Sequence, residues 1–343
     1  MLPKQQITPE YRAALEKQQY RFVGNHSAVK VCGWTKNLIL NKGGCYKFKF
    51  YGIRSHQCLQ MTTSMFCASR CVFCWRGEKA PLSQEWYGPI DNPSYIVDEA
   101  IAQHIGLLIG YKGNEKANKR FTKEMQEVRH VALSLTGEPI TYPQINGVLE
   151  EFHKRKISTF LVSNAQYPDE IASIKNVTQL YLSIDAPNKD LFKRVDRPMF
   201  SDYYERMLKC LDALAHKKCR TCIRLTIVKG INDTDIERYA ELIMRGKPDY
   251  IEVKGYVHVG ASQGLLKINN MPYMEDIEAF SEKLDVLLHD YEIADVHKPS
   301  KVLLFVRKGI PRYINFPKFF EIVNEGKQAE AKEYSADVMC PNI

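Results

Sequence analysis

The chain has 343 residues, of which 45% are hydrophobic and 26% are charged, and its formal net charge is +8. No apolar run reaches the length of about 20 residues that spans a bilayer, and the polar N-terminal stretch lacks a signal-peptide core. These properties argue against a membrane protein and a small disulfide-stabilised secreted protein, so we expect a soluble cytoplasmic protein. In that reducing compartment, ten cysteines indicate metal binding rather than disulfide bonds.

The first 60 residues contain three widely spaced cysteines, Cys32, Cys45 and Cys58, with twelve residues between neighbours. Residues 28–31 and 46–51 are runs typical of β-strands, and a turn-forming NKGG sequence lies between them. The three cysteines can converge if these segments pack side by side. Any one of them alone is by default a small core residue, so only the set of three indicates a metal site.

The sequence CASRCVFCWRG at residues 67–77 contains Cys67, Cys71 and Cys74 in the spacing Cys-x3-Cys-x2-Cys. Three thiolates in one loop can bind three irons of a [4Fe–4S] cluster and leave the fourth iron without a protein ligand. That iron can bind S-adenosylmethionine (SAM), whose reductive cleavage yields a 5′-deoxyadenosyl radical. A zinc site would usually have four ligands, in two separated pairs. The pattern resembles the radical-SAM family.

From residue 61 onward, β-like and helical segments alternate. Strands are predicted at residues 61–66, 130–136, 158–163, 178–184, 222–228, 249–253 and 301–306. Asn92 and Pro93 are typical of the start of a helix, and His104 lies on the apolar stripe of that helix, which favours a core histidine over a ligand. The alternation predicts a parallel sheet, open or curled toward a barrel.

We therefore expect an α/β fold, a partial TIM-like (β/α)6 radical-SAM barrel. The barrel core is predicted over residues 61–310. Residues 1–60 are predicted to be an extension carrying the second set of cysteines, and residues 311–343 to be a peripheral C-terminal segment.

Polar residues recur with period two near the predicted strand ends, where a buried parallel sheet should be almost entirely apolar. Ligands of βα folds bind at the carboxyl ends of strands, so these side chains are predicted to line a lumen beneath the cysteine loop. The candidates for SAM binding are Thr136, Gly137, Glu138, Ser163, Asn164, Ser183, Asp185 and Arg224. Residues 136–138 resemble the Gly-Gly-Glu segment of radical-SAM enzymes, with Thr136 in place of the first glycine. For any single candidate, a strand-end hydrogen bond is an equally good interpretation.

Six segments together resemble the 4-demethylwyosine synthase family in its stand-alone archaeal form. They are CASRCVFCWRG at 67, HVALSLTGEPITYP at 130, TFLVSNAQYP at 159, QLYLSIDAPN at 179, RLTIVKGIND at 224 and VKGYVHVGAS at 253. The resemblance implies a synthase that condenses N1-methylguanosine of tRNA-Phe, 3′ of the anticodon, with pyruvate to form a tricyclic base. Methionine and 5′-deoxyadenosine would be released, and a separate flavodoxin- or ferredoxin-type protein would supply the electron. We expect a monomer.

The same resemblance implies a second [4Fe–4S] cluster on Cys32, Cys45 and Cys58, and a Schiff base between Lys47 and pyruvate. If residues 46–51 form a strand, Cys45 and Lys47 point to one side, which would place an amine beside the second cluster. Lys49 shares that side and is the alternative. The open iron of the second cluster is another candidate for holding pyruvate.

Residues 112–129 form a charged stretch with a basic first half, predicted to be an exposed helical insertion near the catalytic end of the sheet. Such a charge run is usually a solvated surface. The net positive charge also suits a tRNA partner, and the predicted phosphate contacts are Lys112, Lys116, Lys119 and Arg120.

Two other classes of protein fit parts of the sequence. One is a radical-SAM enzyme that uses an auxiliary cluster to modify a peptide or protein. The other is a non-catalytic iron–sulfur protein that binds RNA, which the polar strand ends and the complete loop triad argue against.

Overall fold

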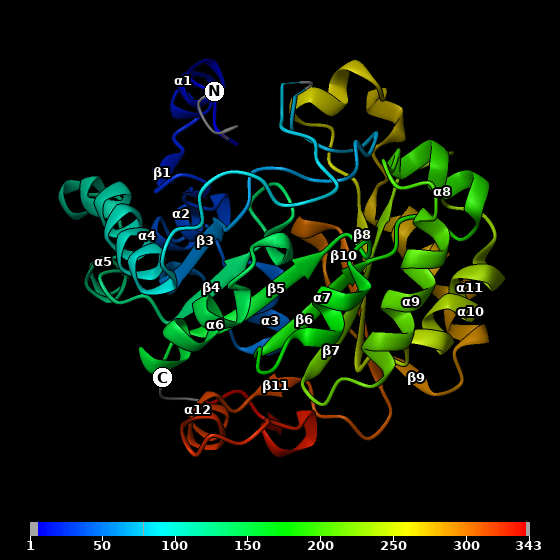
Figure 1. Cartoon of the computed structure of the whole chain (residues 1–343). Helices are drawn as coiled ribbons and strands as arrows, with labels where there is room; N and C mark the ends of the chain where they lie inside the picture. The colour runs from blue at the N-terminus through cyan, green and yellow to red at the C-terminus, as the bar shows by residue number, and fades with distance from the viewer. Residues whose placement is uncertain (1–5, 78, 341–343) are drawn as a thin grey trace.

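The computed structural model describes residues 6–77 and 79–340, which form an α/β fold around one large sheet (Figure 1). Its ten strands follow the order β1-β2-β3-β4-β5-β6-β7-β8-β10-β9. The central strands are parallel: β3 (Cys58–Thr62), β4 (His130–Leu133), β5 (Ser158–Ser163), β6 (Gln179–Ser183), β7 (Arg220–Ile227) and β8 (Tyr250–Gly255). Antiparallel strands flank them: β1 (Arg21–Val23), β2 (Ser27–Val29), β9 (Tyr291–His297) and β10 (Val302–Arg307).

Helices cover the outer face of this sheet, as Figure 1 shows for α4, α6, α7, α9, α10 and α11. These helices are α4 (Pro93–Leu108), α6 (Ile145–Lys154), α7 (Pro168–Ser173), α9 (Tyr203–Ala215), α10 (Ile236–Gly246) and α11 (Met274–Leu287). The remaining helices are α1 (Pro9–Glu16), α2 (Gly33–Ile39), α3 (Tyr46–Tyr51), α5 (Lys119–Glu124), α8 (Lys189–Asp196) and α12 (Phe316–Asn324). The predicted (β/α)6 architecture is confirmed.

Helix α4 begins as the sequence predicts. The side chain of Asn92 accepts a hydrogen bond from the backbone N–H of Ser94, and Pro93 is the first helical residue. His104 is fully buried on the packed side of this helix, which confirms it as a core histidine. Burial lowers its pKa to about 4, so the ring is neutral at physiological pH.

The first parallel strand starts earlier than predicted, at Cys58 rather than residue 61. The proposed domain boundary at residue 60 therefore falls inside β3. Strands β1 and β2 of the N-terminal extension also pair into the same sheet, β2 directly with β3. The extension is thus continuous with the barrel through shared backbone hydrogen bonds.

Residues 46–51 form helix α3, so the strand prediction was wrong. The YKFKFY sequence alternates aromatic and basic residues, but the buried positions are Tyr46, Lys47, Phe50 and Tyr51. That pattern of adjacent pairs four apart belongs to a helix face. Gly52, at φ 84°, ends the helix in the left-handed conformation that glycine adopts without strain. Tertiary packing of one face overrides the strand-like alternation.

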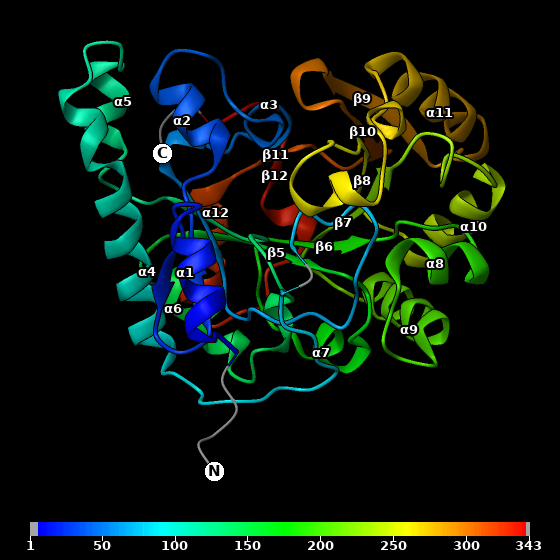
Figure 2. The ribbon, with the colours of Figure 1, turned by 90° about the horizontal axis from the view of Figure 1, so that it is seen from above.

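Helices α2 and α3 lie between α5 and the β9–β10 edge of the sheet (Figure 2). Contacts from this segment reach both sides, because α2 packs against α5 and α3 packs against β9. Trp34 of α2 also makes an edge-to-face ring contact with His297 at the end of β9. The N-terminal extension therefore helps to close the open side of the partial barrel.

The C-terminal segment is not peripheral, contrary to the prediction. It pairs β11 (Tyr313–Ile314) with β12 (Ser335–Ala336) and packs α12 beneath the sheet (Figure 1). Phe316, Phe319 and Tyr334 are buried in a core shared with α3 and with Phe160 and Tyr181 on the inner face of the sheet. These aromatic side chains fill the lower part of the barrel, which explains why an isolated barrel core would be incomplete.

The basic insertion lies at the opposite end of the sheet from the one expected. Helix α4 runs back toward the start of the strands, and Arg129 donates its backbone N–H to Gln57, just before β3. The backbone N–H of Asn118 donates to the carbonyl of Ile39 in α2, and Glu124 contacts His56.

In the described ranges, no helix is long and apolar enough to span a membrane.

Candidate cluster and substrate site

The cysteine loop that follows β3 is held by backbone hydrogen bonds to the last turn of α8 and to the residue that follows it. Val72 donates its N–H to the carbonyl of Val195 at 2.8 Å, and Arg70 donates to Arg197 at 3.3 Å. The loop that carries Cys67, Cys71 and Cys74 is therefore held in shape by contacts with the end of α8 as well as by its own turn. No disulfide joins the ten cysteines, all of which lie in the described ranges.

Gly137, predicted from the strand-end motif, provides space for this loop. Its φ is 64°, and a Cβ atom there would lie 2.0 Å from the carbonyl oxygen of Ser64. The next backbone N–H, of Glu138, donates to the carbonyl of Phe66 at 2.7 Å. Only glycine allows the end of β4 to approach the cysteine loop this closely.

Each loop cysteine has a polar neighbour. Asn164 donates its side-chain N–H to the Cys67 sulfur at 3.3 Å, and the Cys71 thiol donates to Asp196 at 3.2 Å. Burial raises the pKa of the Cys67 thiol to about 11. Buried thiols of this kind become thiolates when a metal supplies the compensating positive charge. Asp196, the last residue of α8, was missed in the sequence, where it belongs to no recognisable motif.

One carboxylate oxygen of Glu138, beside this loop, is available to bind a ligand. One carboxylate oxygen accepts the backbone N–H of Asn164 at 3.0 Å, whereas the other has no partner among the described residues. Burial raises the pKa of this carboxyl to about 8. The hydroxyl of Thr136 is also buried without a described partner. A buried, half-satisfied carboxyl beside the cysteine loop fits the ammonium group of SAM.

The other predicted SAM contacts lie at the carboxyl ends of β5, β6 and β7. Ser163 and Asn164 end β5 beside Glu138. Asp185 accepts the backbone N–H of Thr226 at 2.8 Å, and burial raises its pKa to about 6. Arg224 donates to the Ser183 hydroxyl at 3.4 Å. The strand ends thus bring all of these residues to one side of the sheet, although Asp185 already has a structural partner.

The second set of cysteines is assembled from three elements. Cys32 precedes α2, Cys45 precedes α3, and Cys58 begins β3. The side-chain hydroxyl of Ser55 donates to the Cys45 sulfur at 3.3 Å. Burial and the nearby charges of Cys45 and Cys32 raise the pKa of Cys58, so the three thiols are neighbours. Two of them, Cys32 and Cys45, occupy the N-cap positions of α2 and α3.

The donor sets fit iron–sulfur clusters better than a single ion. Among residues 6–77 and 79–340, no three His, Cys, Asp or Glu side chains are grouped closely enough to hold one metal ion. In a [4Fe–4S] cluster each thiolate binds a different iron, so the sulfur atoms are spread over the faces of the cluster. Three cysteines at each site would hold three irons of such a cluster and leave one iron without a cysteine ligand.

Lys47 lies beside the second set of cysteines, although the strand argument for placing it there was wrong. It is 9% exposed, and its Nζ lies 4.4 Å from the ring centroid of Tyr181 on the inner face of β6. Burial lowers its pKa, and the nearest charges are those of Glu252, Arg224, Cys58 and Cys45. The helix directs this amine into the barrel lumen.

Lys49 points elsewhere. Its Nζ lies 2.6 Å from a carboxylate oxygen of Asp295 and donates to the carbonyl of Val296, and its side chain is 48% exposed. In a strand, Lys47 and Lys49 would have shared one face. In helix α3 they are separated by about 200°, since each residue turns the helix by about 100°.

Glu252 and Lys254 of β8 also face this lumen. Tyr51 donates its hydroxyl to one carboxylate oxygen of Glu252 at 2.9 Å, while the other oxygen has no partner in the described part of the chain. Burial and the charge of Arg224 lower the pKa of Lys254 to about 8. Their period-two placement was visible in the sequence, but their position beside Lys47 was not.

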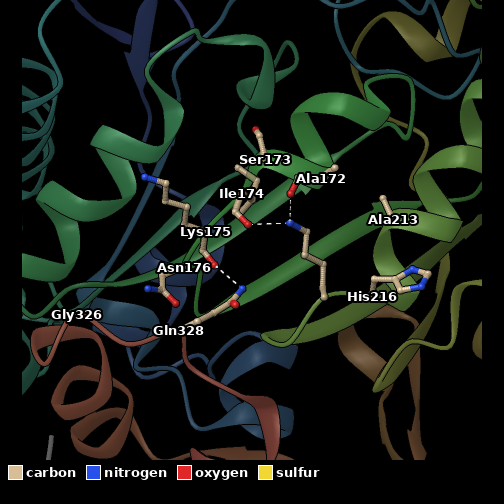
Figure 3. Close-up of a pocket in the computed structure, with 10 residues that line it drawn as sticks. Ala172, Ser173, Ile174, Lys175, Asn176, Ala213, His216, Gly326 and Gln328 are labelled. Carbon is tan, nitrogen blue, oxygen red and sulfur yellow. Dashed lines mark hydrogen bonds between the residues drawn. The ribbon is translucent and has the colours of Figure 1, made fainter.

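A cavity of about 190 Å³ borders the cysteine loop and is lined by Cys71, Cys74, Arg76 and Leu265 among others. A larger cavity of about 680 Å³ lies at the amino-terminal ends of β6 and β7, away from the cysteines (Figure 3). There, Lys217 donates to the carbonyls of Ala172 and Ile174, and Gln328 donates to that of Lys175. The Gln328 contact ties the C-terminal segment to the barrel, and the Lys217 contacts join two segments of the barrel. We therefore assign this cavity a structural role.

Comparisons with known proteins identify the class. A sequence model of the Radical SAM superfamily matches residues 61–243, and a model described as wyosine base formation matches residues 245–307. The chain therefore belongs to the radical SAM superfamily.

The particular family follows from curated relatives that match almost the whole of this chain. The chain is 43% identical over 342 residues to tRNA 4-demethylwyosine synthase TYW1 of Xenopus laevis, covering 97% of this chain and 46% of that protein. It is 44% identical to the tRNA 4-demethylwyosine synthase of Oryza sativa subsp. japonica, covering 96% of this chain and 52% of that protein. The chain thus spans about half the length of these curated relatives.

Two solved structures extend the comparison. "Structure of TYW1 with a lysine-pyruvate adduct bound" aligns with a TM-score of 0.80 and 37% identity, covering 91% of this chain and 99% of that one. "Crystal structure of archaeal TYW1" aligns with a TM-score of 0.72 and 34% identity, covering 90% of this chain and 99% of that one. The chain belongs to the TYW1 family.

Proposed function

We propose that this protein is a tRNA 4-demethylwyosine synthase, which condenses N1-methylguanosine of tRNA-Phe with pyruvate to form the tricyclic base. The observation that carries the proposal is the buried Lys47 amine beside Cys45 and Cys58, in the lumen beneath the carboxyl ends of the strands. The relative whose structure contains a lysine–pyruvate adduct supports the use of pyruvate.

Cys67, Cys71 and Cys74 would hold a [4Fe–4S] cluster, which with SAM bound would supply a 5′-deoxyadenosyl radical. Glu138 accepts the ammonium of SAM through its unpartnered oxygen, and Gly137 keeps the end of β4 close to the loop. Thr136, Ser163, Asn164, Ser183, Asp185 and Arg224 provide the remaining polar groups at the strand ends. These residues would hold SAM beside the cysteine loop, at the carboxyl ends of the strands.

Lys47 acts as the covalent catalyst. Its neutral amine attacks the ketone carbon of pyruvate, and loss of one water molecule gives the Schiff base. Burial of the side chain beneath Tyr181 and Phe160 keeps bulk water away from that bond. Cys32, Cys45 and Cys58 hold the second [4Fe–4S] cluster next to it.

We further propose that the protein resembles the archaeal form and works as a monomer in the cytoplasm. The likeness to the solved archaeal TYW1, with a TM-score of 0.72 and 34% identity, supports the archaeal form. The electron is then supplied by a separate flavodoxin- or ferredoxin-type protein. A reducing compartment also suits a protein whose ten cysteines form no disulfide.

The test is mass spectrometry of nucleosides from tRNA-Phe incubated anaerobically with reconstituted protein, SAM, pyruvate and dithionite. We expect 4-demethylwyosine to appear only when the tRNA carries N1-methylguanosine and pyruvate is present. Transcript tRNA with unmodified guanosine is the matched control. SAM cleavage without any tricyclic nucleoside would overturn the assignment and direct attention to other substrates.

A further inference from the structure

Lys254 lies on the inner face of the barrel, two residues after the fully buried Glu252. The intervening Val253 and the preceding Ile251 belong to the outer core beneath the helices. Because side chains alternate along a strand, Glu252 and Lys254 both project into the lumen. In the sheet register they lie opposite Arg224 and Thr226 of β7.

The charged surroundings of Lys254 overlap those of Lys47. Arg224 and Glu252 are charged neighbours of both lysines. Lys254 additionally has Cys32 nearby, whereas Lys47 has Cys45 and Cys58. The two amines therefore lie in the same part of the lumen, near the second set of cysteines.

Two other charged groups in this part of the lumen each have one hydrogen-bond partner, while the second carboxylate oxygen of Glu252 has none among the described residues. Glu252 accepts the hydroxyl of Tyr51, and Arg224 donates to Ser183. The side-chain ammonium of Lys254 makes no hydrogen bond or ion pair with another residue in the ranges 6–77 and 79–340. A half-buried ammonium that faces a lumen without a protein partner is suited to binding an anion.

We propose that Lys254 binds the carboxylate of the keto acid whose ketone carbon is held by Lys47. This inference rests on the proposed function, and it assigns the recognition of the acid group within that site. In pyruvate the carboxylate is bonded directly to the ketone carbon, so a group that binds it must lie close to Lys47. Glu252 and the cysteine thiolates would repel the carboxylate, and Lys254 offsets that repulsion.

The experiment measures adduct formation on Lys47 by borohydride trapping at increasing concentrations of labelled pyruvate or of methyl pyruvate, its uncharged ester. For Lys254→Met we expect the half-saturating pyruvate concentration to rise roughly 10- to 100-fold, the effect of losing one charged hydrogen bond. Trapping of methyl pyruvate should stay unchanged, since the ester has no carboxylate. Lys254→Arg, which keeps the charge, should restore most of the pyruvate affinity.

Lys301 offers a matched control, because it is a neighbouring lysine whose Nζ donates to the carbonyl of Pro272 at 3.0 Å. Lys301→Met should leave pyruvate trapping unchanged. Iron content and SAM cleavage with dithionite are measured for every variant, to show that each is folded and carries its clusters.

Three results would overturn the inference. Unchanged pyruvate dependence in Lys254→Met would show that the carboxylate binds elsewhere. Equal losses for pyruvate and its ester would show that Lys254 only supports the position of Lys47. Label on Lys254 would make that lysine the covalent catalyst. If the unmodified protein forms no adduct at all, the proposed function fails as well, which separates that failure from a defect confined to the variant.

Discussion

The two sets of cysteines differ in how the chain brings them together. Cys67, Cys71 and Cys74 lie within eight consecutive residues of one loop. Cys32, Cys45 and Cys58 span 27 residues and come from the starts of α2, α3 and β3. The first site needs a loop of the right shape, whereas the second site needs three elements to pack correctly.

This difference has consequences for the substrate groups around each site. The loop site takes its polar neighbours, such as Glu138 and Asn164, from the strand ends of the barrel. The second site carries its own lysine on α3, one of the helices that closes the barrel. Packing of the N-terminal extension therefore positions both the cysteines proposed to hold a second cluster and the amine proposed to bind pyruvate.

The largest effect is expected from removing each set of cysteines separately. Replacing Cys67, Cys71 and Cys74 with Ala should abolish SAM cleavage, because the loop can then no longer hold the cluster that binds SAM. Replacing Cys32, Cys45 and Cys58 with Ala should abolish the tricyclic product but preserve SAM cleavage. Iron analysis should give about eight irons in the unmodified protein and about four in either variant.

A fully reconstituted, unmodified protein with only four irons would falsify the two-cluster proposal. Loss of SAM cleavage in the variant lacking Cys32, Cys45 and Cys58 would show that the two sites are not independent. Circular dichroism distinguishes that outcome from simple unfolding of the N-terminal extension.

Changing Lys47 to Arg tests the second site without disturbing its cysteines. Arginine keeps the positive charge but cannot form the Schiff base, so product formation should fall by roughly 100-fold or more. Both clusters and basal SAM cleavage should remain. Lys49→Arg is the matched control, since the Lys49 amine binds Asp295 and Val296 instead of facing the lumen. Full product formation by Lys47→Arg would favour the open iron of the second cluster as the pyruvate site.

Gly137→Ala should impair the loop site selectively. The added methyl would lie 2.0 Å from the Ser64 carbonyl oxygen and displace the cysteine loop. We expect SAM cleavage to fall roughly 10- to 100-fold, the effect of a displacement of about 1 Å in a reacting group. Gly106→Ala on α4 is the control, because a Cβ there meets nothing within 4 Å. Normal SAM cleavage by Gly137→Ala would mean that the loop tolerates a wider separation from β4.

The smallest effect is expected from the basic insertion, which packs against α2 of the N-terminal extension. Lys112, Lys116, Lys119 and Arg120 are exposed there, and we propose that they contact tRNA phosphates. Changing Lys116, Lys119 and Arg120 to Gln should weaken tRNA binding several-fold and flatten its salt dependence by about one unit per lost contact. Changing Lys318 and Lys327, whose side chains are exposed on the C-terminal segment, to Gln serves as the control. Equal tRNA affinity in both variants would leave the insertion as an ordinary solvated surface.

Several features were predictable because short stretches of sequence determine them. The Asn92-Pro93 start of α4 and the cysteine spacing of the loop depend on neighbouring residues alone. The parallel strands were recognisable from their apolar runs and from the regular alternation with helices. Residues 46–51 were misassigned, because their alternating pattern matches a strand while long-range packing selects a helix.

By itself, the sequence determined the order of the parallel strands with helices between them, the loop triad and the strand-end positions of the polar residues. These features follow from local periodicity and from the rule that parallel strands expose their carboxyl ends on one side. Tertiary structure alone decided that Lys47 and Lys254 share a lumen, that Lys49 does not, and that the C-terminal segment fills the barrel. Those outcomes depend on contacts between residues far apart in the chain, which no local pattern encodes.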